Sequence, residues 1–226
     1  MRILKQLEAS GLPEQHVRRM QAGASPASGM NPSQTRPSLL IRVRDPADVD
    51  AWNQFASQYG ELIVRYAQAR GLQYCDAEDV RQLLLTKLAT TLRSFEYQPG
   101  RGRFRDYLGA AVRNAVNSWR RCPGRPAAAV DLSEVAEPPD PASSEPDPLW
   151  EQEWMAHHYR RALESLRQTC EPQSIAVFTR LLAGQSVEEA AQAESMSADA
   201  VRKVRQRVRA RMAELVAQQI REEDQA

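Results

Sequence analysis

Cysteine, histidine and long apolar runs are scarce in this chain of 226 residues. Its three cysteines lie far apart and form no CxxC pair, so the sequence indicates neither a disulfide framework nor a zinc site. No apolar run approaches the roughly twenty residues that cross a bilayer, and the N-terminus lacks the apolar centre of a secretion signal. We therefore expect a reduced cytoplasmic protein with no membrane insertion, no metal and no cofactor.

Catalytic signatures are missing as well. No nucleophile and base stand in a familiar spacing, and no phosphate-binding glycine motif appears. The one pair of adjacent histidines, His157 and His158, falls in a helical pattern, where neighbouring positions point in different directions. We expect one of them at the surface and the other partly packed, and the sequence predicts no enzyme.

Charge is distributed in blocks, although the net charge is only +1. Between Arg93 and Arg125 eight arginines stand against two acidic residues, whereas the segment from Pro126 to Glu153 holds eight acidic residues and no basic one. A partner responds to such local blocks rather than to the average charge. The modest net charge therefore does not argue against a partner that is itself highly charged.

Apolar residues recur at helical spacing through most of the chain, which predicts an all-α fold. The first strong pattern begins at Asp45 and ends at Gly71, a residue suited to terminate a helix. Asp76 is expected to cap a second helix that ends near Ser94. A third helix carries one buried face between residues 107 and 119.

A proline-rich acidic segment divides the chain into two small helical domains. It contains seven prolines, and such a composition cannot bury enough apolar surface to order itself. Met30 lies just before the patterned part of the chain, so the sequence leaves two candidates for the translation start, Met1 and Met30. We predict a disordered extension over 1–36, a helical domain over 37–122, a flexible linker over 123–148, a helix-turn-helix domain over 149–218 and a tail over 219–226.

The loop and helix between Phe95 and Arg121 have the composition of a surface for single-stranded nucleic acid. Proline and glycine residues between positions 99 and 102 force a loop, through which aromatic residues and arginines alternate. Aromatic faces stack on bases, and guanidinium groups hold phosphates. The alternative is a structural turn that Phe95 and Phe104 anchor to the core, and both interpretations can hold together.

The segment from residue 186 to residue 215 predicts a helix-turn-helix. Ser186 and Glu189 fit a capping box at the start of the first helix, and Ser197 is placed to cap the second. Between Ser197 and Arg211 six basic residues stand against a single acidic one, away from an apolar stripe. That asymmetry favours contact with DNA over a merely solvated face.

The chain, with these features in this order, resembles the sigma factors of bacterial RNA polymerase, specifically the compact extracytoplasmic-function (ECF) group. The resemblance covers about residues 37–218 and implies a promoter-specificity subunit that binds core polymerase, recognises minus-thirty-five and minus-ten elements and promotes DNA opening. Its most specific elements are the run Asp76-Ala-Glu-Asp-Val-Arg-Gln82, the run Gly102-Arg-Phe-Arg-Asp-Tyr-Leu108 leading to Arg113-Asn114, and the helix-turn-helix.

The resemblance also assigns residues to three surfaces. Docking on the largest polymerase subunit would involve Glu78, Asp79 and Gln82, although an acidic helix start is also favoured by the helix dipole alone. The duplex minus-thirty-five element would meet Ser197, Arg202, Lys203, Gln206 and Arg207. Melted minus-ten DNA would be bound by Arg101, Arg103, Phe104, Arg105, Arg113, Asn114 and Asn117. In this set Phe104 would form the wall of a pocket for a flipped base, and Asn114 would read that base by hydrogen bonds.

Further partners follow from the same resemblance. The second domain would also grip the flap of the second-largest polymerase subunit, and an anti-sigma factor would cover the polymerase-binding surfaces. The acidic linker would thread the channel by which RNA leaves the polymerase, because its charge mimics that of RNA; the alternative is an ordinary spacer. The alternative function is a stand-alone helix-turn-helix transcriptional regulator that uses only the second domain.

Overall fold

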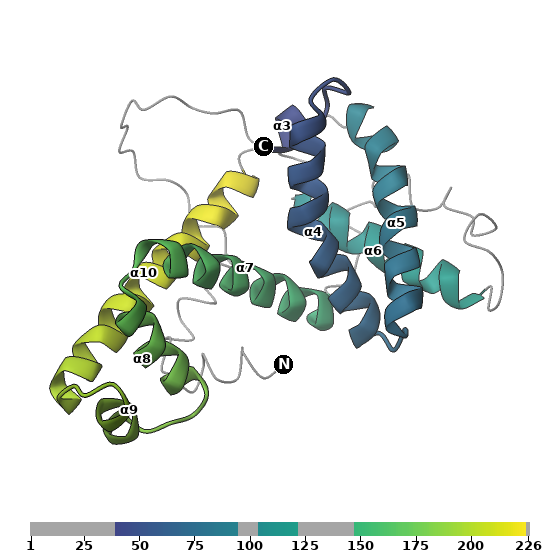
Figure 1. Cartoon of the computed structure of the whole chain (residues 1–226). Helices are drawn as coiled ribbons and strands as arrows, with labels where there is room; N and C mark the ends of the chain where they lie inside the picture. Colours follow the sequence, from purple (N-terminus) through teal and green to yellow (C-terminus); the bar gives the residue numbers. More distant parts are fainter. Residues whose placement is uncertain (1–38, 95–103, 122–146, 225–226) are drawn as a thin grey trace. The chain divides into compact units, whose positions relative to one another are not determined.

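The computed structural model describes residues 39–94, 104–121 and 147–224. Within these ranges every regular element is a helix, as the sequence predicts (Figure 1). They form two compact units: an N-terminal unit, with the described residues between 39 and 154 and residues 222–224, and a C-terminal unit, with residues 155–221. None of the described helices has the length and apolar character that crossing a bilayer requires. The predicted extension over 1–36 and nearly all of the linker lie outside the described residues.

The N-terminal unit begins with α3 (Leu39–Arg42) and α4 (Val49–Ala69). Asp48 caps α4, because its carboxylate accepts a backbone N–H of the first turn at 2.9 Å and also pairs with Arg42 at 2.9 Å. At the far end Gly71 takes a φ of +93°, a conformation that only glycine adopts easily, and the helix stops. The first predicted helix and its end are therefore confirmed, although the helix begins at Val49 rather than at Asp45.

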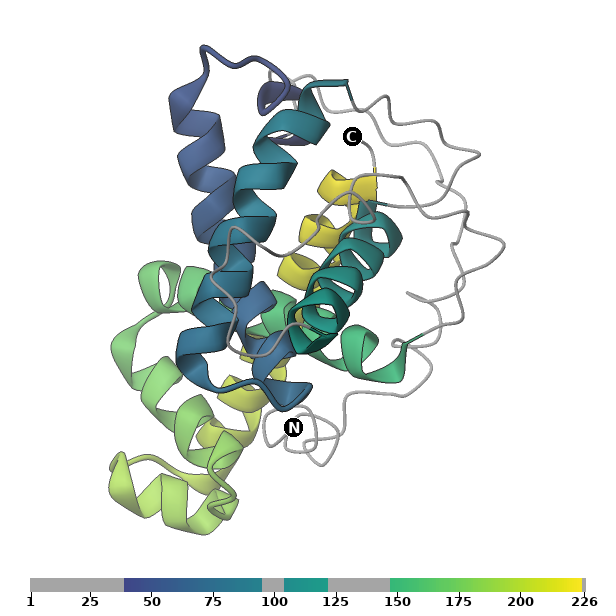
Figure 2. The same cartoon turned by 90° about the vertical axis from the view of Figure 1, so that its right-hand side faces the viewer.

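The next helix, α5 (Tyr74–Thr91), runs back alongside α4 and continues into the short 3-10 turn η1 (Leu92–Ser94) (Figures 1 and 2). It begins earlier than the sequence predicts. Gln73 occupies the N-cap position with extended backbone and no side-chain capping bond, so the prediction that Asp76 caps this helix is wrong. Asp76 lies in the first turn instead, where the helix dipole favours a negative charge.

The core of the N-terminal unit is completed by α6 (Phe104–Arg121). Its buried face repeats at helical spacing, as predicted, and packs with the apolar faces of α4 and α5. Trp119, expected on the same face, is only partly buried. The largest enclosed side chains of this core include Phe55, Tyr59, Leu62, Ile63, Tyr66, Leu84, Leu88, Phe104 and Leu108.

The division between the units falls within α7 (Pro148–Thr169). Leu149, Trp150 and Trp154 from its first two turns pack into the N-terminal core, so that unit extends past the boundary predicted at residue 148. The reason is a close approach to α6, because a Cβ added to Gly109 would lie 2.5 Å from Nε1 of Trp150. A glycine within α6 leaves room for a tryptophan that the sequence assigned to the second domain.

The C-terminal unit contains the remainder of α7 together with α8 (Pro172–Leu182), α9 (Val187–Ala193) and α10 (Ala198–Asp224) as far as Arg221 (Figures 1 and 2). Pro172 opens α8, at a position where its missing N–H is not needed. Gly184, with a φ of +92°, follows the end of that helix. The last helix continues to Asp224, so the predicted tail over 219–226 is helical as far as residue 224.

Candidate nucleic-acid interfaces

The helix-turn-helix consists of α9 and the first part of α10. Ser186 accepts the backbone N–H of Glu189 at 3.1 Å, and the carboxylate of Glu189 accepts the backbone N–H of Ser186 at 2.7 Å, which completes the predicted capping box. Ser195 takes a φ of +53° in the turn, and Ser197 then accepts the backbone N–H of Ala200 at 3.1 Å. Both predicted caps are confirmed: Ser186 marks the start of α9 and Ser197 marks the start of α10.

One face of α10 is buried and the other is exposed. The buried side chains are Val201, Val204, Val208, Met212 and Val216, and Leu215 is partly buried beside them. The residues assigned to duplex DNA are all exposed: Ser197, Arg202, Lys203, Gln206 and Arg207. The structure therefore brings these five side chains to the surface of one helix start.

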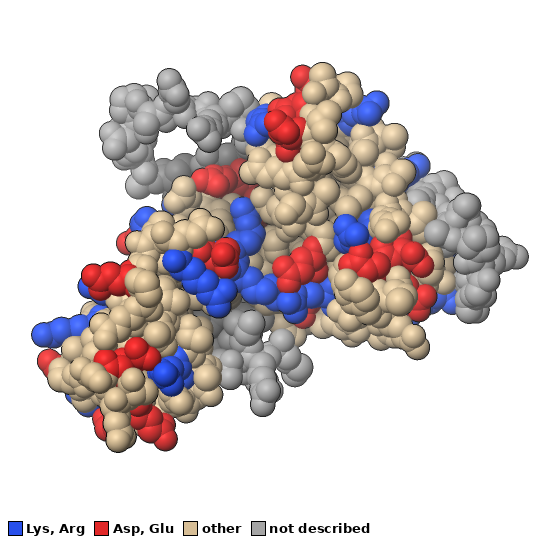
Figure 3. Space-filling view, in the orientation of Figure 1, with Lys and Arg blue, Asp and Glu red and all other residues tan. Residues whose placement is uncertain are grey.

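The cations of this surface have weakly held acidic neighbours. Arg202 lies 3.6 Å from Glu188 and 3.9 Å from Asp199, and Lys203 lies 3.7 Å from Asp199. All four side chains are more than half exposed, and exposed ion pairs of this length contribute little. The face of the C-terminal unit visible in Figure 3 shows basic and acidic side chains interspersed. A phosphate can displace such partners at small cost.

Arg207 differs from its neighbours because a buried group fixes it. Its Nη2 donates to Oγ of Ser174 at 2.9 Å, and Ser174 in α8 is only 4% exposed. This bond ties the outward side of α10 to α8 and limits how far the guanidinium can move. Arg207 can therefore support the helix as well as meet DNA.

The structure does not place Phe104 where a base could reach it. Its side chain is 1% exposed, and its ring lies edge-on to Phe55 at 6.0 Å and to Tyr59 at 5.5 Å between centroids. An aromatic ring with both faces covered has no surface for stacking. The assignment of Phe104 as the wall of a base pocket is therefore wrong for this conformation, and the alternative interpretation, an anchor in the core, describes its position.

Arg105 is also held by the protein. Its side chain is 13% exposed and lies 3.2 Å from Glu151 of α7 and 3.7 Å from Asp106. A guanidinium so enclosed and paired is a poor ligand for a phosphate, since binding would first break the pair with Glu151. The assignment of Arg105 to DNA is thus a second correction, and its partner on α7 could not be seen from the local sequence.

The remaining minus-ten candidates are divided between the surface of α6 and the undescribed loop. Arg113 and Asn114 are half-buried, and Asn117 is exposed one turn beyond Arg113. Phe104 and Asn114 do not form a wall and a reader together, because the ring of Phe104 faces the core. Arg101 and Arg103 lie outside the described residues.

The polymerase-docking candidates lie at the start of α5. Asp79 and Gln82 are exposed, three positions apart on one side of the helix, whereas Glu78 is half-buried and pairs with Arg81 at 2.6 Å. Sequence reasoning missed Tyr74, whose side chain is 60% exposed at the same helix start. A hydrogen bond to Glu78 raises the pKa of Tyr74 above its ordinary value. The available signal was an aromatic residue two positions before the first of the acidic residues Asp76, Glu78 and Asp79.

The two histidines of α7 are both buried, so the expectation of one surface histidine is wrong. His157 is 3% exposed and His158 is 0% exposed, and all residues from 154 to 159 are enclosed. Nδ1 of His158 lies 3.0 Å from Oε1 of Gln219 in α10. Burial, with smaller contributions from His158, Arg161 and Arg160, lowers the pKa of His157 to about 2. This imidazole is therefore neutral at physiological pH.

No protein-family model matches the chain, and no curated protein or solved structure matches it either. Over the described ranges, no three His, Cys, Asp or Glu side chains gather closely enough to hold a metal ion. The two candidate surfaces, at the starts of α5 and α10, thus rest on their own geometry and charge.

Proposed function

We propose that this protein is a promoter-specificity subunit of bacterial RNA polymerase, an ECF-type sigma factor that acts in the cytoplasm and catalyses no reaction itself. The observation that carries the proposal is the doubly capped helix-turn-helix, with Arg202, Lys203 and Gln206 exposed on the second helix. A short helix, a tight turn and a basic helix start are the parts with which such motifs enter the major groove. The order of the other motifs along the chain supports the same function.

In this proposal the C-terminal unit reads the minus-thirty-five element as a duplex. Arg202 and Gln206 are one turn apart on α10, and each can make paired hydrogen bonds to a base edge. A good pair discriminates against the wrong base by about 1–3 kcal/mol. Lys203 and Arg207 then serve the phosphates beside the groove, with Arg207 oriented by Ser174.

The N-terminal unit provides the contacts to core polymerase and to the opened strand. Asp79 and Gln82 are the exposed members of the docking surface on α5, and Tyr74 extends it. On α6, Arg113 and Asn117 lie one turn apart and can follow a strand backbone together with the arginines of the preceding loop. Phe104 serves as an anchor that holds the start of α6 in the core.

The acidic linker and the remaining partners complete the proposal. A chain with many carboxylates is attracted into a basic channel, which fits the path by which RNA leaves the polymerase. An anti-sigma factor would compete for the same docking surfaces. These roles follow from the charge of the linker and from the resemblance of the chain to ECF sigma factors.

Reconstituted transcription with core polymerase and a promoter library tests the proposal. We expect the protein to direct initiation from a defined subset of promoters and to bind promoter DNA poorly by itself, because two small modules gain affinity only when a scaffold fixes their separation. Arg202→Ala and Gln206→Ala should reduce promoter selection, whereas Arg211→Ala, which removes an exposed cation of the same helix paired with Glu214, should not. Tight operator binding without any association with core polymerase would instead identify a stand-alone regulator.

A further inference from the structure

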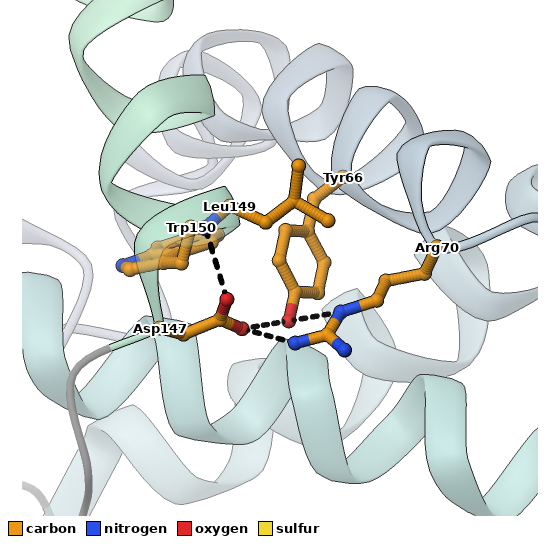
Figure 4. A network of polar contacts seen from close by, with 5 residues as sticks. All are labelled: Tyr66, Arg70, Asp147, Leu149 and Trp150. Atoms are coloured by element: carbon orange, nitrogen blue, oxygen red, sulfur yellow. Dashed lines mark hydrogen bonds and ion pairs between the residues drawn. The ribbon is translucent and has the colours of Figure 1, made fainter.

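Asp147 shows how a carboxylate at the start of a helix serves the fold of this protein (Figure 4). Its Oδ1 accepts the backbone N–H groups of Leu149 at 3.1 Å and Trp150 at 3.4 Å, and so caps α7. Its Oδ2 accepts hydrogen bonds from the hydroxyl of Tyr66 and from Nη2 of Arg70. The side chain is 9% exposed, so the protein both uses and covers this carboxylate.

Asp199 lies at the start of α10 in different surroundings. Ser197 caps this helix, because its Oγ accepts the backbone N–H of Ala200 at 3.1 Å. The side chain of Asp199 is 74% exposed and lies 3.9 Å from Nη1 of Arg202 and 3.7 Å from Nζ of Lys203. Exposed pairs of this length contribute little, and the helix dipole favours an acidic residue in this turn only modestly. The fold therefore depends little on the carboxylate of Asp199.

The position of Asp199 on α10 places it among the residues assigned to duplex DNA. The buried side chains of this helix, from Val201 to Val216, mark the side that packs on the core. Residues three, four and seven positions apart share one side of a helix. The exposed side of the first turns therefore carries Asp199, Arg202, Lys203 and Gln206. Asp199 comes first along this side, and the N-terminal residues of a recognition helix are those that contact base edges.

A carboxylate on this side of α10 can only accept hydrogen bonds, and it repels phosphates. In the major groove guanine presents two acceptors, and thymine presents an acceptor beside a methyl group, so neither base offers Asp199 a partner. Adenine presents a donor next to the N7 acceptor, which repels a carboxylate. Cytosine presents the N4 amino group, a donor. Cytosine is therefore the base that suits Asp199.

We propose that Asp199 determines specificity for duplex DNA: its carboxylate accepts a hydrogen bond from N4 of one cytosine in the minus-thirty-five element. This inference rests on the proposed function and adds to it a reading residue and the base that it reads. On binding, Arg202 and Lys203 exchange their loose contacts with Asp199 for contacts with DNA. The repulsion between the carboxylate and the phosphates lowers the affinity for every sequence, and only the correct base offsets it.

Selection from a randomised promoter library measures the base preference at every position. The full-length protein bound to core polymerase should select cytosine at one position of the minus-thirty-five element about tenfold over the other bases. Asp199→Ala should lose this preference and bind the whole library at least as tightly, because the repulsion of phosphates is gone. Asp199→Asn should move the preference at the same position to adenine, since an amide pairs with N6 and N7 of adenine.

The matched control uses the second acidic neighbour of Arg202. Glu188 of α9 lies 3.6 Å from Nη2 of Arg202, and its side chain is 70% exposed. Glu188→Ala therefore also frees Arg202 from one exposed carboxylate, but it leaves Asp199 in place. We expect this variant to retain the cytosine preference. Loss of the same preference in Glu188→Ala would assign the effect to the release of Arg202 and would overturn the inference.

Two further results separate the inference from the proposed function. If the wild-type protein selects promoters with core polymerase, but Asp199→Ala and Asp199→Asn leave the base preference unchanged at every position, the inference is overturned and the proposed function remains. If the wild-type protein selects no promoter with core polymerase, the proposed function is overturned and the inference with it.

Discussion

The packing of Trp150 against Gly109 makes Gly109→Ala a sharp test of how α7 is held. An added Cβ would lie 2.5 Å, 2.7 Å and 2.8 Å from Nε1, Cε2 and Cδ1 of the indole, distances that real Cβ atoms do not show. The indole is a rigid plane whose atoms cannot move apart from one another. The ring as a whole must therefore shift, or the start of α7 must leave its site.

The expected cost follows from two opposing terms. Removing a buried tryptophan from its site exposes about 150–250 Å², worth at most about 4–6 kcal/mol, while a smaller shift costs about 1–3 kcal/mol as overpacking. Alanine in the middle of a helix gains about 1 kcal/mol over glycine. The net destabilisation expected of Gly109→Ala is therefore about 0–2 kcal/mol if the ring only shifts and about 3–5 kcal/mol if it leaves its site, and the tryptophan emission of the protein should move towards that of an exposed indole.

Urea unfolding followed by circular dichroism and tryptophan fluorescence measures both effects. Gly60→Ala is the matched control, since it also replaces a buried glycine within a helix, but its Cβ would meet only the flexible side chain of Arg81 at 3.3 Å. The control should be neutral or slightly stabilising. Equal stability changes in the two variants, with the tryptophan emission unshifted in Gly109→Ala, would refute the close packing on which the reasoning depends.

Three further predictions concern the C-terminal unit. His157 has a folded pKa of about 2 against an ordinary value of 6.5, so between these pH values the unfolded state binds a proton that the folded state does not. The stabilisation is therefore complete above pH 6.5 and is lost progressively below it, and lowering the pH from 7 to 5 should reduce the free energy of unfolding in urea by about 2 kcal/mol. A His157→Leu variant with the same pH dependence would contradict this. Arg202→Ala and Gln206→Ala should each weaken the affinity of the polymerase-bound protein for its promoter about tenfold in a fluorescence anisotropy titration. A larger loss of affinity in Arg211→Ala would assign the effect to net charge instead. Ser186→Ala should lower the melting temperature through the loss of about 1 kcal/mol of capping, and an unchanged value would show that the box contributes nothing.

Local signals in the sequence were sufficient for the helices and most of their ends. Gly71, Ser186 and Ser197 act through groups within a few residues of themselves, so their roles can be derived from the chain alone. The start of α5 was missed because no side-chain cap marks it, and Gln73 uses its backbone conformation instead. Helix ends that depend on neighbouring residues can therefore be predicted from the sequence.

Long-range contacts decided the residues that sequence reasoning misplaced. Phe104 is buried because Phe55 and Tyr59 in α4 enclose it, and Arg105 is occupied because Glu151 in α7 lies beside it. A motif of alternating aromatic and basic residues has the same composition whether its rings face DNA or a core. On α10, by contrast, the apolar stripe fixes which side is exposed, so the basic residues could be placed correctly.

The docking of α7 also bears on how the protein can be divided. Trp150 and Trp154 complete the interior of the N-terminal unit from a position beyond the linker. A fragment that stops before Asp147 would present an empty apolar slot between α4 and α6, and a separate peptide with the sequence of α7 would be the natural molecule to fill it. The protein is thus suited to fragment complementation, in which two pieces that are incomplete alone restore one folded unit on mixing.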